Sequence, residues 1–109
     1  MKIAGRSVLV TGASSGIGEA TAKAVARKGG KVILLARSKT ELERVAGEIR
    51  AQGGSASLFP VDLADAAALS SAARAVMAGT GIPDIIINNA GAGRWLTVGE
   101  TGEGERPGR

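Results

Sequence analysis

Residues 11–18 form a glycine-rich segment, TGASSGIG, whose residue types and spacing suit the binding of phosphate groups. Gly12 would let the chain turn sharply, Gly16 would let the backbone approach a ligand without an intervening Cβ atom, and Gly18 would let a following helix pack closely on a sheet. The first amide groups of that helix have no partners within it, so they can bind an anion, and the two serines of the segment add hydroxyl donors. We expect a diphosphate to bind here; the alternative is a flexible turn with no ligand. The loop is not a P-loop, because no Gly-Lys-Ser/Thr sequence closes it.

The residues that follow the apolar run 32–35, the second such run in the chain, indicate which dinucleotide could bind. NAD sites usually place an aspartate or glutamate there, where it accepts hydrogen bonds from the ribose hydroxyls. This run is instead followed by Arg37 and Ser38, and no carboxylate appears until Glu41. A guanidinium and a hydroxyl suit a 2′-phosphate, so the sequence favours NADP(H) over NAD. Alternatively, Arg37 is a solvated charge at the end of a strand.

Two further polar positions follow predicted strands. Asp62 comes after the third apolar run and is placed to accept a hydrogen bond from an adenine amino group; its alternative role is to cap the loop or helix that follows. Residues 88–91, Asn-Asn-Ala-Gly, follow the fourth run, at the carboxyl edge where open α/β sheets bind ligands. Gly91 would permit close approach of a cofactor, whereas the asparagine amides could instead tie neighbouring strands together.

Buried strands that alternate with amphipathic helices would position these residues. Short aliphatic runs predict strands, and apolar residues at helical spacing predict helices. The predicted strands are residues 7–10, 32–35, 57–61 and 85–87. The predicted helices begin at Ile17, at Ser38 and after a loop within 62–80, and glycine pairs at 29–30 and 53–54 end the first two.

Local features refine these predicted elements. Ser38, followed by Glu41, indicates a capping box, and Asp65 is a candidate cap for the third helix. Pro60 has no N–H to donate, so it should lie at a sheet edge or at a strand end. The first helix is expected to bury the stripe Ile17, Ala20, Thr21, Ala24 and Val25. The second helix is expected to bury Leu42, Val45, Ala46 and Ile49.

The β-α-β-α-β-α-β order predicts a partial Rossmann-type fold, a doubly wound α/β arrangement with a parallel sheet. Strands separated by helices pair in parallel through right-handed crossovers, and the expected strand order is 3-2-1-4, with helices on both faces. We assign residues 1–98 to this nucleotide-binding domain. Residues 99–109 contain no side chain that could anchor a core, so a disordered polar tail is expected there.

Composition narrows the chemistry open to the 109-residue chain. Apolar residues make up 44% and aromatic residues 2%, so the core must be aliphatic. The absence of Cys and His removes disulfides, thiolate nucleophiles and the commonest metal ligands, and no metal site is expected. The net charge is +4, but the basic residues are scattered along the chain and do not cluster with aromatic residues, so no nucleic-acid partner is expected. With no signal-peptide pattern and no apolar run that could span a membrane, we expect a cytoplasmic location and no membrane partner.

Together these motifs resemble those of the short-chain dehydrogenase/reductase family. Residues 11–18 resemble its T-G-x-x-x-G-x-G cofactor motif, Asp62 and Leu63 its adenine-contacting pair, and residues 88–91 its N-N-A-G motif. Residues 36–38 are similar to the strand end of NADP-preferring members, and the resemblance covers about residues 4–98. It implies that the cofactor is held by Gly12, Ser14, Ser15, Gly16, Ile17 and Gly18 at the diphosphate, Arg37 and Ser38 at the 2′-phosphate, Asp62 and Leu63 at the adenine, and Asn88, Ala90 and Gly91 at the nicotinamide ribose, with Asn89 bracing the sheet.

The chain departs from the family pattern in a respect that bears on activity. Family members carry a catalytic Ser and a Tyr-x-x-x-Lys motif further along, whereas this chain has no Tyr and no Lys beyond Lys39. Ser70 and Ser71 precede the fourth strand, so they cannot substitute. The resemblance therefore implies the cofactor-binding portion of an oxidoreductase that transfers a hydride between a nicotinamide and an alcohol or carbonyl, with this chain inactive alone.

The fourth predicted strand suggests a second kind of function. In a four-stranded sheet, residues 85–87 would form an exposed apolar edge, which favours self-association. A non-catalytic nucleotide-binding or interaction module that pairs through this edge is therefore the alternative to an enzyme portion. A methyltransferase that uses S-adenosylmethionine is disfavoured, because such sites favour an acidic residue where Arg37 stands.

Overall fold

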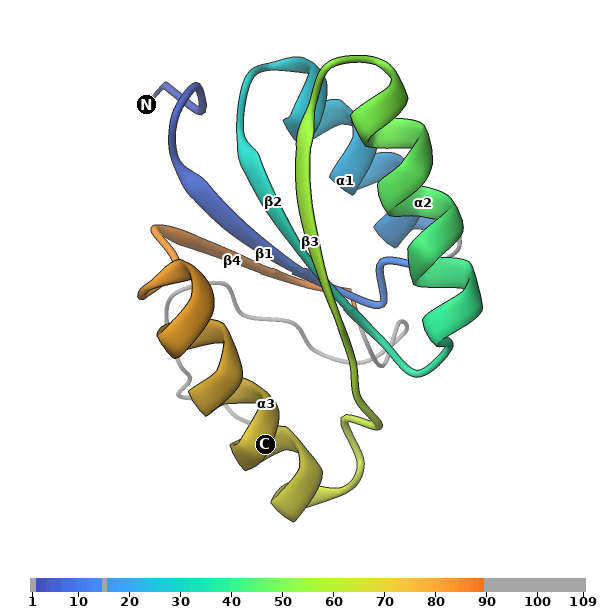
Figure 1. Ribbon diagram of the computed structural model, residues 1–109, viewed down its shortest axis with the longest axis vertical. Coiled ribbons are helices and arrows are strands. Elements are labelled where there is room, and N and C mark those ends of the chain that lie inside the picture. Colours follow the sequence, from blue (N-terminus) through green and yellow to red (C-terminus); the bar gives the residue numbers. More distant parts are fainter. Residues whose placement is uncertain (1, 15, 90–109) are drawn as a thin grey trace, which may run out of the picture.

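The computed structural model of the chain describes residues 2–14 and 16–89, which form seven alternating strands and helices in the predicted order (Figure 1). The elements are β1 (Ser7–Thr11), α1 (Gly16–Arg27), β2 (Lys31–Ala36), α2 (Lys39–Ala51), β3 (Ser55–Pro60), α3 (Ala66–Thr80) and β4 (Ile85–Asn88). The predictions for Ser15, Ala90 and Gly91, and for a tail at 99–109, lie outside the described residues.

The strands form one parallel sheet in the order β3-β2-β1-β4, which confirms the predicted fold class and topology. β1 is central, with Val10 opposite Leu34 of β2 on one side and opposite Ile87 of β4 on the other. After β1 the chain continues to β2 and β3 on one side, and it then crosses to β4 on the other side of β1. Open α/β sheets bind ligands at such a point, beyond the carboxyl ends of the strands, so the fold directs attention to the end of β1.

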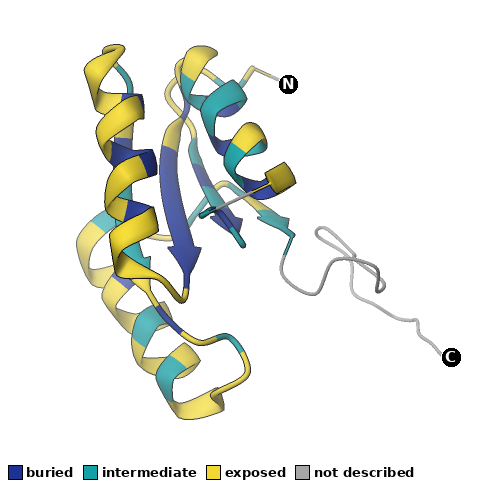
Figure 2. Cartoon of the chain, turned by 90° about the vertical axis from the view of Figure 1, so that its right-hand side faces the viewer, coloured by how far each residue is buried: buried dark blue, intermediate teal, exposed yellow. Residues whose placement is uncertain are grey.

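Helices cover both faces of the sheet (Figure 1). α1 and α2 pack on the face that includes the fully buried Val8 and Leu34, and α3 lies on the opposite face, where Val76 packs with Ile33. Figure 2 shows that burial is concentrated in the strands and in the inward-facing turns of the helices. The four predicted inner residues of α2 are all buried, namely Leu42, Val45, Ala46 and Ile49.

The prediction for the buried face of α1 was right for Val25 and wrong for Ile17 and Ala20. Gly18, Ala22 and Val25 are buried, whereas Ile17 is 75% exposed and Ala20 is also exposed. Hydrophobic periodicity placed Ile17 inside because it weighted side-chain apolarity and ignored glycine. The inner position is held by Gly18, which lies so close to the preceding loop that a Cβ atom would not fit.

Ser38 and Asp65 cap α2 and α3 as predicted. The Ser38 Oγ accepts a hydrogen bond from the Glu41 N–H at 3.2 Å, and the Asp65 Oδ1 accepts one from the Ala68 N–H at 3.0 Å. The Glu41 carboxylate turns instead to Arg44, whose Nε donates to it at 2.9 Å. The second half of the predicted capping box is therefore replaced by an ion pair.

β3 begins at Ser55, earlier than the predicted 57–61, and ends at Pro60. It begins early because backbone pairing, such as that of Ser55 with Lys31, does not require apolar side chains. Pro60 is the last residue of an edge strand, as its missing N–H predicted. Within the described ranges, no helix has both the length and the apolarity needed to cross a membrane.

Candidate cofactor-binding site

The loop after β1 turns through two glycines with left-handed backbone. Gly12 has φ 64° and Gly16 has φ 59°, backbone angles that residues with a Cβ atom rarely adopt. Between them, Ala13 is fully buried, and its N–H donates to the Leu35 carbonyl at 3.2 Å. The base of the loop is thus fixed to β2 while its outer part leads into α1.

Gly18 is required for a different reason from the one predicted. A Cβ atom there would lie 1.8 Å from the Gly12 carbonyl oxygen and 2.6 Å from its carbon. The close approach is therefore between α1 and the loop itself, not between α1 and the sheet. At Gly16, a Cβ would meet no atom of the described residues within 4 Å, so its backbone borders open space in which a ligand could lie.

Thr11 joins the carboxyl ends of β1 and β4. Thr11 is buried, with 7% of its surface exposed. The Thr11 hydroxyl donates to the Asn88 Oδ1 at 2.7 Å and accepts from the Asn89 N–H at 2.9 Å. The asparagine pair thus ties neighbouring strands, the alternative left open by the sequence. The Asn89 Nδ2 is buried and has no hydrogen-bond acceptor among the described residues.

The sequence analysis did not predict the hydrogen bonds by which Thr11 joins β1 to the end of β4. The signal was available in the strand order, because β1 and β4 are neighbours and their register places Thr11 opposite Asn88. A hydroxyl at the last position of a central strand is then expected to bond with the amide beside it.

Arg37 and Ser38 are exposed at the point where the chain leaves β2. Arg37 makes no hydrogen bond or ion pair within the described part of the chain, so its guanidinium is available to an anion. Ser38 uses its oxygen to accept from α2, and its hydroxyl hydrogen can still donate to a ligand. Both residues therefore retain the donors that a phosphate needs.

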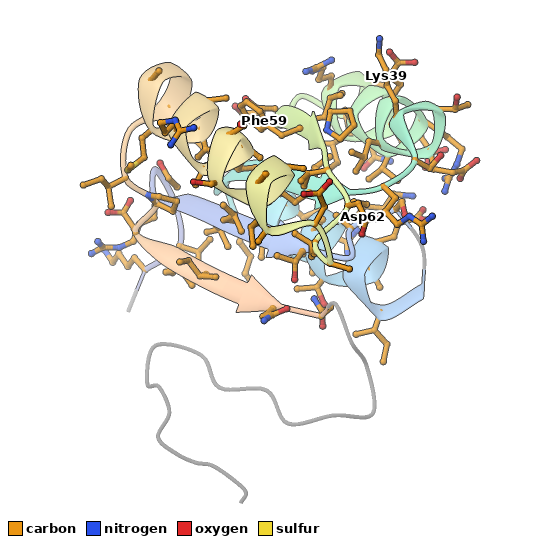
Figure 3. The ribbon with its side chains drawn as sticks, turned by 90° about the horizontal axis from the view of Figure 1, so that it is seen from below. Lys39, Phe59 and Asp62 are labelled. Carbon is orange, nitrogen blue, oxygen red and sulfur yellow. The ribbon has the colours of Figure 1, made fainter. Side chains whose placement is uncertain are left out.

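Asp62 lies exposed on the loop that leaves β3 (Figure 3). Its Oδ1 accepts from the Ala64 N–H at 3.0 Å, which corresponds to the predicted alternative of capping the local loop. The preceding Val61 N–H donates to the Ala36 carbonyl at 2.8 Å, so the ends of β3 and β2 are held together. Leu63 is half-buried and packs on the face covered by α3.

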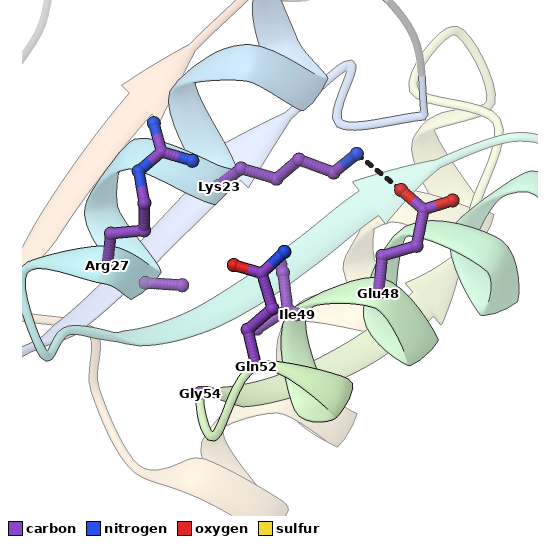
Figure 4. Close-up of a pocket in the computed structure, with 7 residues that line it drawn as sticks. Lys23, Arg27, Glu48, Ile49, Gln52 and Gly54 are labelled. Atoms are coloured by element: carbon purple, nitrogen blue, oxygen red, sulfur yellow. Dashed lines mark hydrogen bonds and ion pairs between the residues drawn. The ribbon is translucent and has the colours of Figure 1, made fainter.

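A network of ion pairs between α1 and α2 was not predicted. Arg44 donates to Glu19 and to Glu41, each at 2.9 Å, and to Glu48 at 3.3 Å. Lys23 donates to Glu19 at 2.7 Å and also pairs with Glu48, as Figure 4 shows. The pairs within one helix follow spacings of three or four residues and could have been read from the sequence. The pairs between helices depend on how α1 and α2 pack.

This network changes the ionisation of its carboxyl groups. Hydrogen bonds from Arg44 and Lys23 lower the pKa of Glu19 from its ordinary 4.5 to about 2. The pKa of Glu48 is also lowered, chiefly by Lys23. Both carboxyl groups are therefore charged at neutral pH and held by cations.

A polar cavity of about 250 Å³ lies between α1 and α2 (Figure 4). No predicted cofactor residue lines it, so it is separate from the carboxyl edge of the sheet. Its lining consists of Lys23, Ala26, Arg27, Glu48, Ile49, Gln52 and Gly54.

The strand ends bring the predicted site residues together. The loop at Gly12, the Arg37–Ser38 pair, Asp62 and Asn88 each follow or end a parallel strand at the same edge of the sheet. This arrangement defines the class of protein, a Rossmann-type α/β domain of the kind that binds dinucleotides. The chain belongs to the short chain dehydrogenase family, whose family model matches residues 6–105.

Curated relatives in this family are much longer than the chain. An uncharacterized oxidoreductase of Mycobacterium tuberculosis is 49% identical over 92 residues, which cover 82% of this chain and 27% of the relative. A fatty acyl-CoA reductase of Acinetobacter baylyi is 46% identical over 89 residues, which cover 82% of this chain and 30% of the relative. The chain therefore spans less than a third of the length of these relatives.

Solved structures show the same fold with bound cofactor. The L-sorbose reductase of Gluconobacter frateurii, complexed with NADPH and L-sorbose, is 31% identical over 94% of this chain and 40% of that protein, with a TM-score of 0.78. A metagenomic short-chain oxidoreductase in complex with NADP is 37% identical over 79% of this chain and 39% of that protein, with a TM-score of 0.74.

Proposed function

We propose that this chain is the NADP(H)-binding portion of an oxidoreductase that acts on an alcohol or a carbonyl. The observation that carries the proposal is the exposed Arg37–Ser38 pair at the end of β2, where NAD sites place a carboxylate. The two similar structures with NADP or NADPH support the same choice of cofactor.

Each part of the cofactor has a matching group of residues. In this proposal the open backbone at Gly16 and the N-terminal amides of α1 receive the diphosphate, because these amides have no partners within the helix. Arg37 and Ser38 receive the 2′-phosphate, and Asp62 and Leu63 flank the adenine. The proposed set is completed by Gly12, Ser14, Ser15, Ile17 and Gly18 at the diphosphate and by Asn88, Ala90 and Gly91 at the nicotinamide ribose.

The exposed side chain of Ile17 fits this proposal. It is 75% exposed at the first turn of α1, although an isoleucine in an amphipathic helix is normally buried. A cofactor lying along the carboxyl edge would cover it and remove apolar surface from water.

Hydride transfer is the chemistry that the nicotinamide supplies when it is bound. The chain contributes binding and orientation, and it contains no Tyr or His that could exchange a proton with a substrate oxygen. We therefore propose that the isolated chain does not oxidise NADPH in the presence of ketones. Ketone-dependent loss of NADPH absorbance by the purified chain would contradict this part of the proposal.

Fluorescence titration of the chain with NADPH and NADH tests the choice of cofactor. We expect tighter binding of NADPH, and we expect Arg37→Ala to weaken NADPH binding by about tenfold, which corresponds to one hydrogen-bonded charge pair. NADH binding should change little, because NADH lacks the 2′-phosphate that Arg37 is proposed to hold.

Arg27→Ala is a suitable control for this titration. The substitution removes the same charge as Arg37→Ala, but Arg27 lines the cavity between α1 and α2 and not the proposed cofactor site. It should leave both affinities as they are. A wild-type chain that binds neither dinucleotide, or that prefers NADH, contradicts the proposed function.

A further inference from the structure

Arg44 on α2 contacts both the loop of the glycine-rich segment 11–18 and the first turn of α1. Its Nη2 donates to the Glu19 carboxylate at 2.9 Å and to the Ser14 carbonyl at 3.3 Å. Ser14 belongs to the glycine-rich loop, and Glu19 lies in the first turn of the helix that follows it. One guanidinium therefore holds both sides of the loop-to-helix junction from a neighbouring helix.

The charges around Arg44 disfavour direct contact of its guanidinium with a phosphate. Glu19, Glu41 and Glu48 all lie within 3.3 Å of its nitrogen atoms, and Lys23 is the second cation of the network. Three carboxylates against two cations leave the network with a net negative charge. An arginine in this position is occupied by its own neighbours, whereas Arg37 is open to an anion.

Two physical effects of Arg44 favour anion binding at the loop. First, a Ser14 carbonyl that is bonded to α2 does not turn its oxygen toward an incoming phosphate. Second, Glu19 stands close to a helix N-terminus that would receive the diphosphate, and an uncompensated carboxylate there would repel it. Arg44 and Lys23 compensate that charge.

We propose that Arg44 is a positioning residue for the diphosphate: it fixes the Ser14 carbonyl and compensates the Glu19 carboxylate, so that the loop presents amide donors to an anion. This inference rests on the proposed NADP(H) function. It adds a residue that touches no cofactor atom and lies outside the glycine-rich motif.

Two fragments of the cofactor separate this role from direct phosphate binding. ADP carries the diphosphate without a 2′-phosphate, and 2′-AMP carries a 2′-phosphate without the diphosphate. Affinities of both are measured by competition with NADPH fluorescence. We expect Arg44→Gln to weaken NADPH and ADP by a similar factor of about ten and to leave 2′-AMP unchanged.

The matched control is Arg50→Gln, which removes the same charge from the same helix. Arg50 donates to the Ala56 carbonyl at the start of β3 and does not contact the loop. The control should retain wild-type affinity for NADPH, ADP and 2′-AMP, even where thermal unfolding shows that it is less stable.

Arg44→Lys keeps the positive charge and provides a second test if the glutamine variant fails to fold. A single ammonium cannot reproduce the separate contacts that Nε, Nη1 and Nη2 make with Glu41, Glu48, Glu19 and Ser14. We expect NADPH and ADP to weaken by about threefold, with 2′-AMP unchanged.

The outcomes separate the two proposals. If the wild-type chain does not bind NADPH, the proposed function fails. If it binds NADPH and Arg44→Lys binds ADP with unchanged affinity, the positioning role of Arg44 is wrong. A loss confined to NADPH and 2′-AMP would instead make Arg44 a ligand of the 2′-phosphate, and an equal loss of all three would show a general effect on folding.

Discussion

Two glycines of the glycine-rich segment 11–18 are needed for different physical reasons. Gly16 has open space around it and is required for its backbone, because its φ of 59° disfavours a side chain. Gly18 has an ordinary helical position and is required for space, because the Gly12 carbonyl oxygen occupies the place of its Cβ. The sequence motif does not distinguish these causes, but substitutions should.

Gly18→Ala should destabilise the fold and disrupt the loop. A Cβ placed 1.8 Å from a backbone oxygen forces either α1 or the loop to move, and neither is a flexible side chain that could swing away. We expect the free energy of unfolding to fall by about 1–3 kcal/mol, the usual effect of overpacking. Urea denaturation measures this loss, and NADPH titration should show weakened binding in the population that remains folded.

Gly47→Ala is the matched control for this prediction. Gly47 lies in α2, is exposed, and a Cβ there would meet no atom within 4 Å. Alanine favours a helix over glycine, so this variant should be more stable by about 0.5–1 kcal/mol. Equal stability changes in the two variants would show that the Gly18 contact is not the cause.

The sequence predicted that the candidate residues lie at strand ends better than it predicted which residues they contact. Gly12, Arg37 and Asp62 were identified because each follows an apolar run at a strand end, and that depends only on local pattern. The bond between Thr11 and Asn88 joins residues 77 positions apart. Arg44 was missed for the same reason, because its contact with Ser14 depends on how two helices pack.

At the scale of elements, the strands and α2 were predictable because their hydrophobic pattern is strong. β2 has five consecutive buried residues, and the four inner positions of α2 recur at helical spacing. α1 was not predictable in the same way, because its inward face consists of Gly18, Ala22 and Val25. Small residues carry little hydrophobic signal, and the close packing that they permit becomes visible only in three dimensions.

The α1–α2 network should make stability depend on pH in the acid range. The pKa of Glu19 is about 2 in the folded chain, below its ordinary 4.5, so unfolding is accompanied by proton uptake as the pH falls. Its stabilising contribution is complete above pH 4.5 and is lost as the pH decreases toward 2. The free energy of unfolding should decrease across this interval, and Glu19→Gln should make the decrease shallower.

Urea denaturation at several pH values between about 6 and 2 measures this slope. Glu43→Gln is the control, because Glu43 lies on the exposed side of α2, 3.9 Å from Lys39 and outside the network. A Glu19→Gln slope that equals the wild-type slope would contradict the assignment of the acid dependence to Glu19.

At the scale of the whole molecule, the two edges of the sheet differ. β3 ends at Pro60, which cannot donate to another strand, and it contains the polar Ser55 and Ser57. β4 consists of three isoleucines and an asparagine, and Ile86 is 48% exposed. Among the described residues β4 is the outer strand on this side of the sheet, and an apolar edge strand readily pairs with another chain, so β4 is the edge at which association is expected.

We predict that the isolated chain self-associates through β4. Pairing of two β4 edges would bury the exposed side chain of Ile86, whereas a lysine on an edge strand opposes such pairing. Light scattering coupled to size-exclusion chromatography should show a mass that rises with protein concentration, and Ile86→Lys should remove this dependence. Met77→Lys, which places the same charge at a 50%-exposed position on α3, should leave it in place. A wild-type chain that stays monomeric at high concentration would show that the β4 edge does not pair, and loss of association in both variants would show that the effect of Ile86→Lys is not specific to β4.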